Sequence, residues 1–427
     1  MRFNTLQDWL DWQQTLNPKT IELGLARTRR VFERLQLAPI GQTVISVAGT
    51  NGKGSTVAYY ESWLKNAGFR VASYTSPHIM RYNERIRLNV NPVSDADLCR
   101  AFDAIDRARS DIPLTYFEFG TLAAFYLMAD YAPDVAILEV GLGGRLDAVN
   151  IIDADLAHLT PVGLDHQDWL GDTRELIGAE KAGILRENTL AVVNMEAPPV
   201  SVMQRLHTLN CQAALLNVDY RFKALDDGGI EWRTEQRSIT FKPPLAGAHQ
   251  QLNISGVLAG LDLLGYLQHK SDQQIIDGFT HAHCAGRLQQ LQSEPFELWI
   301  DVGHNVDAAA ALKQTLSAMP SRGKKVVLLG MLEDKDARAF AEALADVVDE
   351  WWLLSVQDER GQSASALARK LPEKLPVSQQ FDNIEAALQH AVSSLDNQDI
   401  LLVTGSFITV EAVMRSTNFQ NIDIFQT

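Results

Sequence analysis

The sequence predicts an α/β protein with two domains, of which the first has a mostly parallel sheet and the second is smaller. Short apolar runs alternate with helical stretches over most of the chain, a rhythm typical of parallel sheets. A glycine-rich turn carrying a lysine follows an early apolar run, at residues 49–55. The length of 427 residues exceeds what one hydrophobic core usually serves. We therefore expect domains at 1–288 and 289–427.

The first domain is predicted element by element from apolar periodicity. Apolar residues between Leu6 and Leu16 recur at helical spacing, and a strand at Thr43–Val47 leads into the glycine-rich turn. The helix after this turn is expected to begin near Ser55 and to end near Gly68. The remaining segments alternate as a parallel sheet requires: a strand at 69–74, a helix at 118–130, and strands at 134–140 and 155–160.

The second half begins with a segment of different character. Residues 210–241 contain short strand-like pieces and read as a small irregular insertion before a helix starting near Asn253. Strands are then expected at 296–301, 325–330, 352–355 and 400–405. The connection around Gly286–Pro295 is short, which suggests a hinge and a cleft that closes on a substrate.

Composition excludes several classes of protein. Lys and Arg total 38 against 53 Asp and Glu, a net charge of −15, which argues against a nucleic-acid or acidic-membrane surface. Three distant cysteines suggest neither disulfides nor a zinc site. The first residues do not resemble a signal peptide, and no apolar run reaches the ~18 residues of a membrane span. We expect a cytoplasmic protein and, without an amphipathic seam, a monomer.

The turn at Gly49–Ser55 is predicted to hold phosphate. Its glycines let backbone N–H groups converge on an anion, Lys53 adds a positive charge, and the following helix adds its positive dipole end. A nucleoside triphosphate is the expected ligand. Gly54 stands where such loops usually carry the Ser or Thr that holds magnesium, so another group must hold the metal.

Polar residues follow three other strands of the same predicted sheet, where ligands of parallel sheets bind. Glu139 closes one strand, and a strand-end carboxylate can hold Mg²⁺; the alternative is an edge glutamate beside a structural turn. Ser76 follows another strand and could supply the missing hydroxyl, although Ser-Pro is also a common turn. His166, between two carboxylates, could be a metal ligand, a phosphate contact or an ordinary loop histidine.

Two further groups of residues are less specific. Lys181 falls in a predicted helix beside Glu180, and its spacing alone predicts a solvated side chain. In the second domain, residues 301–305 offer Asp301, His304 and an amide at a strand end, and Lys335 follows the next strand. Both strand ends lie where a doubly wound sheet binds ligands.

Taken together, these motifs resemble the bifunctional folylpolyglutamate synthase/dihydrofolate synthase family, a branch of the Mur ligase superfamily. The resemblance covers nearly the whole chain. It implies a Mur ligase-like fold, with a P-loop-type domain followed by a smaller Rossmann-like C-terminal domain. The motifs that carry it, in order, are 49–55, 76–78, 114–118, 139–147, 164–166, 180–183, His249-Gln-x-x-Asn253, 286–287 and 301–305.

The resemblance implies an ATP-dependent ligase that adds L-glutamate to dihydropteroate and to tetrahydrofolate derivatives through an acyl phosphate. It implies Mg²⁺ on Ser76, Glu139 and His166, with a carbamylated Lys181 supporting the metal, and catalytic roles for Lys53, Lys181 and His304. The implied ATP contacts are Gly49, Thr50, Asn51, Gly52, Lys53, Gly54, Ser55, Asn253, Arg287 and Asp301. The implied contacts of the pterin substrate are Glu22, Leu23, Gly24, Thr115, Phe117, Asp147 and Ala148.

One departure from the family pattern and three alternatives stand beside this interpretation. Ala285 precedes Gly286-Arg287, whereas the family often has proline at this position; the arginine is retained. The motifs leave open whether both activities are present or folylpolyglutamate synthesis alone. Another Mur-type amino-acid ligase would carry an extra N-terminal domain before the phosphate loop. An ATP-driven switch would hydrolyse ATP without a carboxylate acceptor.

Overall fold

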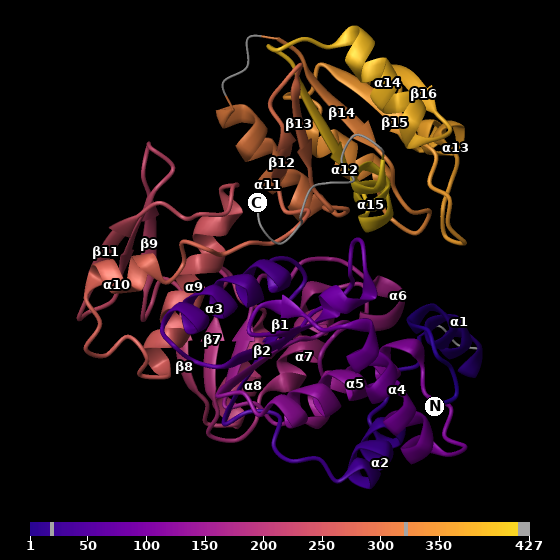
Figure 1. Cartoon of the computed structure of the whole chain (residues 1–427). Helices are drawn as coiled ribbons and strands as arrows, with labels where there is room; N and C mark the ends of the chain where they lie inside the picture. Colours follow the sequence, from indigo (N-terminus) through magenta and orange to yellow (C-terminus); the bar gives the residue numbers. More distant parts are fainter. Residues whose placement is uncertain (18–20, 320–322, 417–427) are drawn as a thin grey trace. The chain divides into compact units, whose positions relative to one another are not determined.

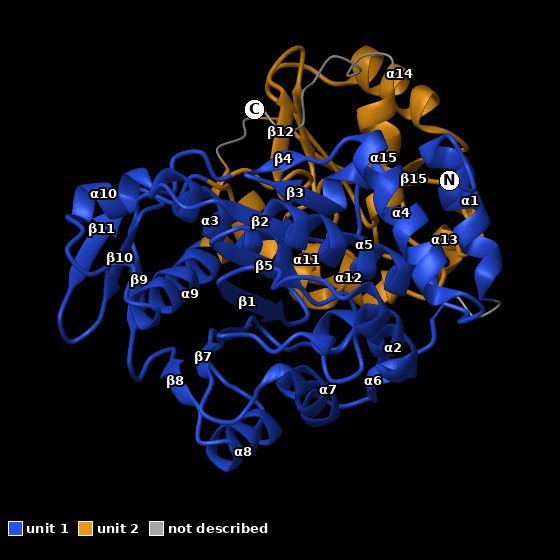
Figure 2. Cartoon of the chain, turned by 60° about the horizontal axis from the view of Figure 1, so that its bottom comes forward, with its two compact units in different colours: residues 1–244, 251–282 blue, residues 245–250, 283–427 orange. Residues whose placement is uncertain are grey.

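The computed structural model describes residues 1–17, 21–319 and 323–416. The chain forms two compact units, Met1–Pro244 with Gln251–Ala282 and Leu245–Gln250 with His283–Thr427, coloured separately in Figure 2. Each unit has its own mostly parallel sheet with helices, which confirms the predicted fold class. The division passes through α9 (His249–Leu263).

An eight-stranded sheet forms the centre of unit 1 (Figure 1). Its order is β4-β3-β2-β5-β1-β6-β7-β8, and neighbouring strands from β2 to β8 are parallel, whereas β3 and β4 are antiparallel additions at one edge. The carboxyl ends of the parallel strands therefore share one edge of the sheet. The strands are β1 Thr43–Ala48, β2 Val71–Tyr74, β3 Ile86–Leu88, β4 Asn91–Pro92, β5 Val135–Glu139, β6 Leu156–Leu159, β7 Leu190–Val193 and β8 Gln212–Leu215.

Helices cover both faces of this sheet. On one face, α3 (Lys53–Asn66) packs on the central strands, and its Tyr60 hydroxyl lies 2.9 Å from His158 Nδ1 on β6. The opposite face supports an extensive core, to which α1 (Leu6–Leu16), α2 (Ala26–Leu35), α4 (Asp95–Arg109) and α5 (Tyr116–Tyr131) contribute. Alternate strand residues supply the two faces, as the period of a strand requires. The other elements of unit 1 are η1 Tyr82–Arg85, η2 Ala148–Ile151, α6 Gln167–Leu170, α7 Arg174–Lys181, η3 Ala182–Ile184, α8 Val200–Thr208 and α10 Asp272–Asp277.

Three predictions about unit 1 need correction. The helix after the phosphate loop begins at Lys53 and not near Ser55, because Gly52 in the left-handed region is its N-cap. Helix α9 begins at His249, before the predicted Asn253. The segment 210–241 is regular and not irregular: β8 extends the large sheet, and β9 (Arg221–Ala224), β10 (Ile230–Arg233) and β11 (Ser238–Phe241) form an antiparallel sheet.

Unit 2 is built on a six-stranded sheet in the order β12-β13-β17-β14-β15-β16. Only β12 is antiparallel to its neighbour, and the other strands are parallel. No helix in the described part of the chain is both long and apolar enough to cross a membrane. The elements of unit 2 are β12 Gln289–Gln292, β13 Glu297–Ile300, α11 Val306–Ala318, β14 Lys325–Leu329, α12 Ala337–Leu344, β15 Glu350–Leu354, α13 Ala364–Lys370, β16 Val377–Phe381, α14 Ile384–Ser394, β17 Ile400–Thr404 and α15 Phe407–Arg415.

Candidate active site

The phosphate loop connects β1 to α3 and is folded around its lysine. Lys53 Nζ donates hydrogen bonds to the carbonyls of Gly49 (3.1 Å) and Thr50 (3.2 Å). The Thr50 hydroxyl binds both the N–H and the carbonyl of Gly163, which follows β6. Gly54 and the buried Ser55 lie in the first turn of α3, and Asn51 lies in the loop before it. The backbone N–H groups of this turn are therefore presented at the positive end of a helix, as an anion site requires.

Two glycines of the loop allow close approaches that a side chain would block. A Cβ at Gly49 would lie 1.8 Å from Thr160 Oγ1, and a Cβ at Gly52 would lie 2.5 Å from Asn253 Oδ1. Gly52 also has φ +88°, in the left-handed region. Asn253 is only 2% exposed. The structure therefore brings Asn253 from α9 directly against the phosphate loop, although the two are far apart in the sequence.

Lys181 is buried against the same loop, so the prediction of a solvated side chain from its spacing was wrong. It ends α7, is 5% exposed, and donates a 2.8 Å hydrogen bond from Nζ to the Gly49 carbonyl. Burial and then the positive charge of Lys53 lower its pKa to about 7, against the opposing effects of Asp165 and Asp147. This lowering favours the neutral amine form of Lys181.

Glu139 and Ser76 lie at neighbouring strand ends. Glu139 ends β5 and is 4% exposed, and the Ser76 backbone N–H donates to its Oε2 at 3.4 Å. The two positions combine a carboxylate with a hydroxyl, oxygen donors of the kind that Mg²⁺ prefers. Across the described residues, no group of three or more His, Cys, Asp or Glu side chains is arranged to hold a metal.

His166 lies in the loop that follows β6, on the exposed N-cap of α6, with φ +52°. Its backbone N–H donates to the Asp165 carboxylate at 2.9 Å. Asp165 in turn is close enough to raise the pKa of Lys181. The loop therefore brings a histidine and a carboxylate to the strand edge that also carries the phosphate loop.

The residues expected to contact a pterin also come together. Gly24 N–H donates to the Leu146 carbonyl at 3.3 Å, which brings Glu22–Gly24 beside Asp147 and the buried Ala148. A Cβ at Gly141 would lie 2.6 Å from the Phe117 ring and 3.3 Å from Asp147 Oδ2. Asp147 accepts hydrogen bonds from the backbone N–H groups of Leu142 and Val149. Its burial raises its pKa to about 6.

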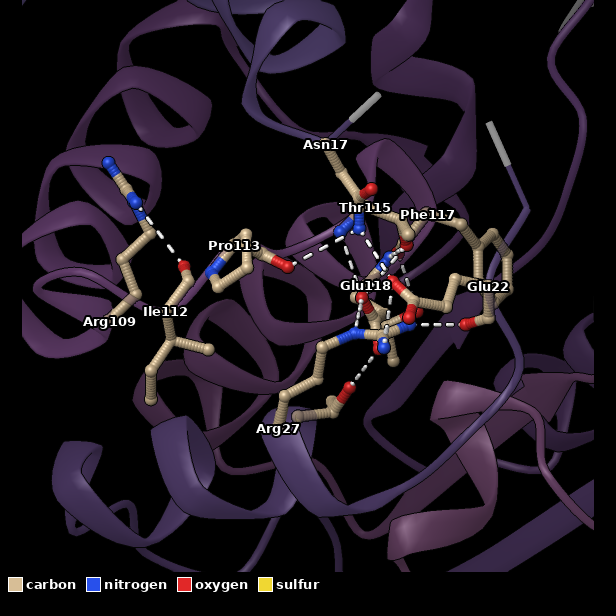
Figure 3. A network of polar contacts seen from close by, with 11 residues as sticks. Asn17, Glu22, Arg27, Arg109, Ile112, Pro113, Thr115, Phe117 and Glu118 are labelled. Carbon is tan, nitrogen blue, oxygen red and sulfur yellow. Dashed lines mark hydrogen bonds and ion pairs between the residues drawn. The ribbon is translucent and has the colours of Figure 1, made fainter. Parts of the chain in front are cut away.

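A buried ionic network holds these segments in place (Figure 3). Glu118 accepts hydrogen bonds from Arg27 Nε (2.7 Å), Thr28 Oγ1 (2.7 Å) and the Thr115 N–H (2.8 Å). Arg27 also forms an ion pair with Glu22 at 3.0 Å. Arg27 and Thr28 are not among the site residues predicted from the sequence. The available signal was Thr115-x-x-Glu118, which forms a capping box at the start of α5.

In unit 2, Asp301, Arg287 and His304 are neighbours. The Asp301 carboxylate, 6% exposed, accepts from the N–H groups of Leu288 (2.9 Å) and Gly303 (2.7 Å). The Arg287 guanidinium lies 5.3 Å from the centre of the Phe407 ring, and His304 Nδ1 lies 3.0 Å from the Val302 carbonyl. Because a carbonyl only accepts, this contact assigns a proton to Nδ1. The predicted site residues thus form one group in unit 1 and a second group in unit 2.

The fold and these two groups of residues define the class of protein. The family model of the Mur ligase middle domain matches residues 47–261, and that of the Mur ligase glutamate ligase domain matches residues 286–407. Both matches include candidate site residues: the phosphate loop in the first, and Arg287, Asp301 and His304 in the second. The two domains are those of a Mur-type ligase.

Full-length relatives identify the branch within this class. The chain is 38% identical to the dihydrofolate synthase/folylpolyglutamate synthase of Escherichia coli K12, over 96% of this chain and 94% of the relative. The Haemophilus influenzae protein of that name is also 38% identical, over 95% and 96% of the two chains. This chain belongs to the dihydrofolate synthase/folylpolyglutamate synthase family.

Solved structures agree with this assignment. E. coli FolC in complex with DHPP and ADP superposes with a TM-score of 0.91 at 36% identity, covering 98% of this chain and 99% of that one. A bifunctional folylpolyglutamate synthase/dihydrofolate synthase with Mn, AMPPNP and L-glutamate bound gives a TM-score of 0.87 at 40% identity, covering 96% and 97%. The similarity therefore extends across both units.

Proposed function

We propose that this protein is an ATP-dependent ligase that joins L-glutamate to dihydropteroate, forming dihydrofolate, and to reduced folates, forming folylpolyglutamates. Family membership over the full length supports the reaction class. The observation that carries the proposal is the buried Lys181 amine on the Gly49 carbonyl of the phosphate loop, beside Lys53. Two lysine amines, those of Lys53 and Lys181, thus bind the same carbonyl of the proposed nucleotide-binding loop.

The chemistry requires activation of the acceptor. A carboxylate reacts poorly with an amine until one of its oxygens becomes part of a leaving group. In the proposed reaction, a carboxylate oxygen attacks the γ-phosphorus of ATP and ADP leaves. The glutamate nitrogen then attacks the acyl carbon, loses a proton, and inorganic phosphate leaves. Lys53, with the N–H groups of its loop, would stabilise negative charge on the transferring phosphoryl group.

The residues at the strand ends fit a magnesium ion. Ser76 and Glu139 are adjacent hard oxygen donors, and His166 belongs to the loop after β6. Together with a carbamylated Lys181 they would hold Mg²⁺, which supplies charge neutralisation to the transferring phosphoryl group when bound. Carbamylation requires an unprotonated amine, and the lowered pKa of Lys181, about 7, provides it. Bonding of the Lys181 nitrogen to CO₂ releases one proton and creates the anion.

The remaining residues would position the substrates. Gly49, Thr50, Asn51, Gly52, Gly54, Ser55 and Asn253 would contact ATP from domain 1–288, with Arg287 at the end of that domain. Asp301 would contact ATP from domain 289–427, and His304 would lie near the acyl phosphate. The pterin would contact Glu22, Leu23, Gly24, Thr115, Asp147 and Ala148, with its ring against Phe117. An aromatic face suits a flat heterocycle.

The proposal is tested by ADP release from purified protein with Mg²⁺, ATP and L-glutamate. Dihydropteroate is supplied in one series and tetrahydrofolate in another. Release that depends on both acceptors supports a bifunctional ligase, and release with tetrahydrofolate alone supports a folylpolyglutamate synthase. Release without any acceptor would support an ATP-driven switch. Release with neither pterin acceptor, but with another carboxylate, would support a different Mur-type ligase.

A further inference from the structure

Arg85 is a buried cation that forms no ion pair among the residues the structure describes. It ends η1, is 8% exposed, and pairs with no carboxylate in the described part of the chain. Arg87, two residues later, shows the usual solution: its guanidinium binds the buried Glu61 carboxylate, at 2.6 Å for the shortest contact. A buried charge without a counter-ion is costly, so a protein rarely retains one without a use for it.

The carboxylate adjacent in sequence does not serve Arg85. Glu84 accepts hydrogen bonds from the backbone N–H groups of Ile79 (2.8 Å), Met80 (2.8 Å) and Arg81 (2.6 Å). It thereby fixes the turn that follows Ser76 and Pro77. Glu84 is therefore adjacent to Arg85 in the sequence, but its carboxylate binds backbone N–H groups. It does not neutralise the Arg85 guanidinium.

The side chains that contact the Arg85 guanidinium are an imidazole and two phenol rings. Arg85 Nε donates a 2.8 Å hydrogen bond to His78 Nδ1, and its guanidinium lies 5.1 Å and 5.7 Å from the ring centres of Tyr82 and Tyr116. Burial raises the pKa of Tyr74 to about 12, and the positive charge of Arg85 opposes this shift. Cation–π contacts partly compensate the burial of a guanidinium but do not neutralise it.

These contacts place Arg85 between two parts of the candidate site. His78 is two residues from Ser76 at the metal end, and Tyr116 lies between Thr115 and Phe117 at the pterin end. The Tyr74 ring lies 6.1 Å from the Phe117 ring. An acceptor that extends from Phe117 towards Ser76 would pass this guanidinium. The planar guanidinium is suited to bind a carboxylate through two parallel hydrogen bonds.

We propose that Arg85 binds a carboxylate of the acceptor substrate, an inference that rests on the proposed function. That carboxylate has two possible sources. One is the reacting carboxylate, present in dihydropteroate and in folates. The other is the non-reacting α-carboxylate of the terminal glutamate, which folates have and dihydropteroate lacks. In either case Arg85 is a positioning residue that sets the acceptor relative to the phosphoryl donor.

The test is a thermodynamic cycle that combines Arg85→Gln with ligand analogues lacking one carboxylate, and that compares their dissociation constants. Equilibrium dialysis measures Kd for dihydropteroate and for its analogue with hydrogen in place of the carboxylate. It also measures Kd for tetrahydrofolate and for its analogue built on γ-aminobutyrate, which lacks only the α-carboxylate. Arg85→Lys retains charge without the planar fork, and Arg81→Gln removes an exposed arginine of the same segment as a matched control.

If Arg85 binds the reacting carboxylate, Arg85→Gln weakens dihydropteroate and tetrahydrofolate about 30-fold or more and leaves the hydrogen analogue unchanged. If it binds the α-carboxylate, Arg85→Gln weakens the binding of tetrahydrofolate only. The binding of dihydropteroate and of the γ-aminobutyrate analogue is then unchanged. Unchanged affinities, or an equal loss for the analogues, would overturn the proposal. Arg85→Lys provides the same comparison if Arg85→Gln does not fold. Wild-type protein that binds no pterin acceptor would instead reject the proposed function.

Discussion

Lys181 Nζ donates a 2.8 Å hydrogen bond to the carbonyl of Gly49, which joins the end of α7 to the first residue of the phosphate loop. The contact brings together residues that are distant in the sequence. It also buries an amine beside Lys53, and this burial lowers the pKa of Lys181 to about 7. The phosphate loop and Lys181 are therefore directly coupled, and a change in one should affect the other.

Removal of Lys181 should abolish ligase activity in a way that a small acid can reverse. In Lys181→Ala, a short carboxylic acid can occupy the vacated space and replace the anionic carbamate. We expect activity to fall at least 100-fold and to recover partly with millimolar to molar acetate, measured as acceptor-dependent ADP release. Glu180→Gln, which alters a partly exposed neighbour, is the control and should show no acetate dependence. Loss of activity in Lys181→Ala without any recovery would contradict the carbamate role.

Glu139→Gln should fold and yet not transfer phosphate. The substitution retains the volume of a side chain that is 4% exposed, but removes the negative charge needed for the metal. We expect an unchanged circular dichroism spectrum. ADP release should fall at least 100-fold, and added Mg²⁺ should not restore it. A folded variant with wild-type turnover would exclude Glu139 as a metal ligand.

Gly52→Ala should damage nucleotide binding beyond the effect of its backbone strain. Its φ of +88° and the 2.5 Å approach of Asn253 Oδ1 both oppose a Cβ. Gly68→Ala is the matched control, since Gly68 has φ +94° but nothing within 4 Å of its Cβ position. We expect each variant to lose about 1–3 kcal/mol of unfolding free energy. Only Gly52→Ala should also raise the KM for ATP at least tenfold.

Glu118→Gln should destabilise unit 1 and weaken acceptor binding. The carboxylate is 3% exposed and binds Arg27, Thr28 and the Thr115 backbone, so its neutralisation leaves Arg27 without its buried partner. Breaking a buried pair in this way costs about 3–5 kcal/mol. Urea unfolding should show this loss, and the acceptor KM should rise while the ATP KM stays within twofold. Equal effects on both substrates would argue against a link to Glu22–Gly24.

His158 should make the folded protein sensitive to mild acid. Burial lowers its pKa to about 3 from an ordinary value of 6.5. Below pH 6.5 the unfolded chain therefore binds a proton that the folded chain does not. As the pH is lowered from there, the free energy of unfolding decreases by up to about 1.4 kcal/mol per pH unit. The measurement is the urea midpoint from pH 7 to 5, compared with His158→Gln. The variant should lose this part of the pH dependence, and parallel curves would contradict the assignment.

The sequence predicted the fold class because strand and helix periods are local properties. It also predicted that Ser76 and Glu139 meet, because parallel strands end at one edge. The burial of Lys181 was not predictable from spacing, since it depends on the approach of α7 to Gly49. The same holds for the approach of Asn253 to Gly52. It holds also for Arg85, because the sequence does not reveal that the neighbouring Glu84 binds backbone N–H groups and that Arg85 has no carboxylate partner among the described residues. Helix α9 and residues 210–241 were misjudged because tertiary packing determines their limits.

In the proposed reaction the acceptor carboxylate is phosphorylated before glutamate attacks. Dihydropteroate labelled with ¹⁸O in its carboxylate tests this directly, by mass spectrometry of the phosphate released with Mg²⁺, ATP and L-glutamate. We expect one ¹⁸O atom in the inorganic phosphate for each dihydrofolate formed, and none in the released ADP. Unlabelled phosphate accompanying labelled product would contradict it.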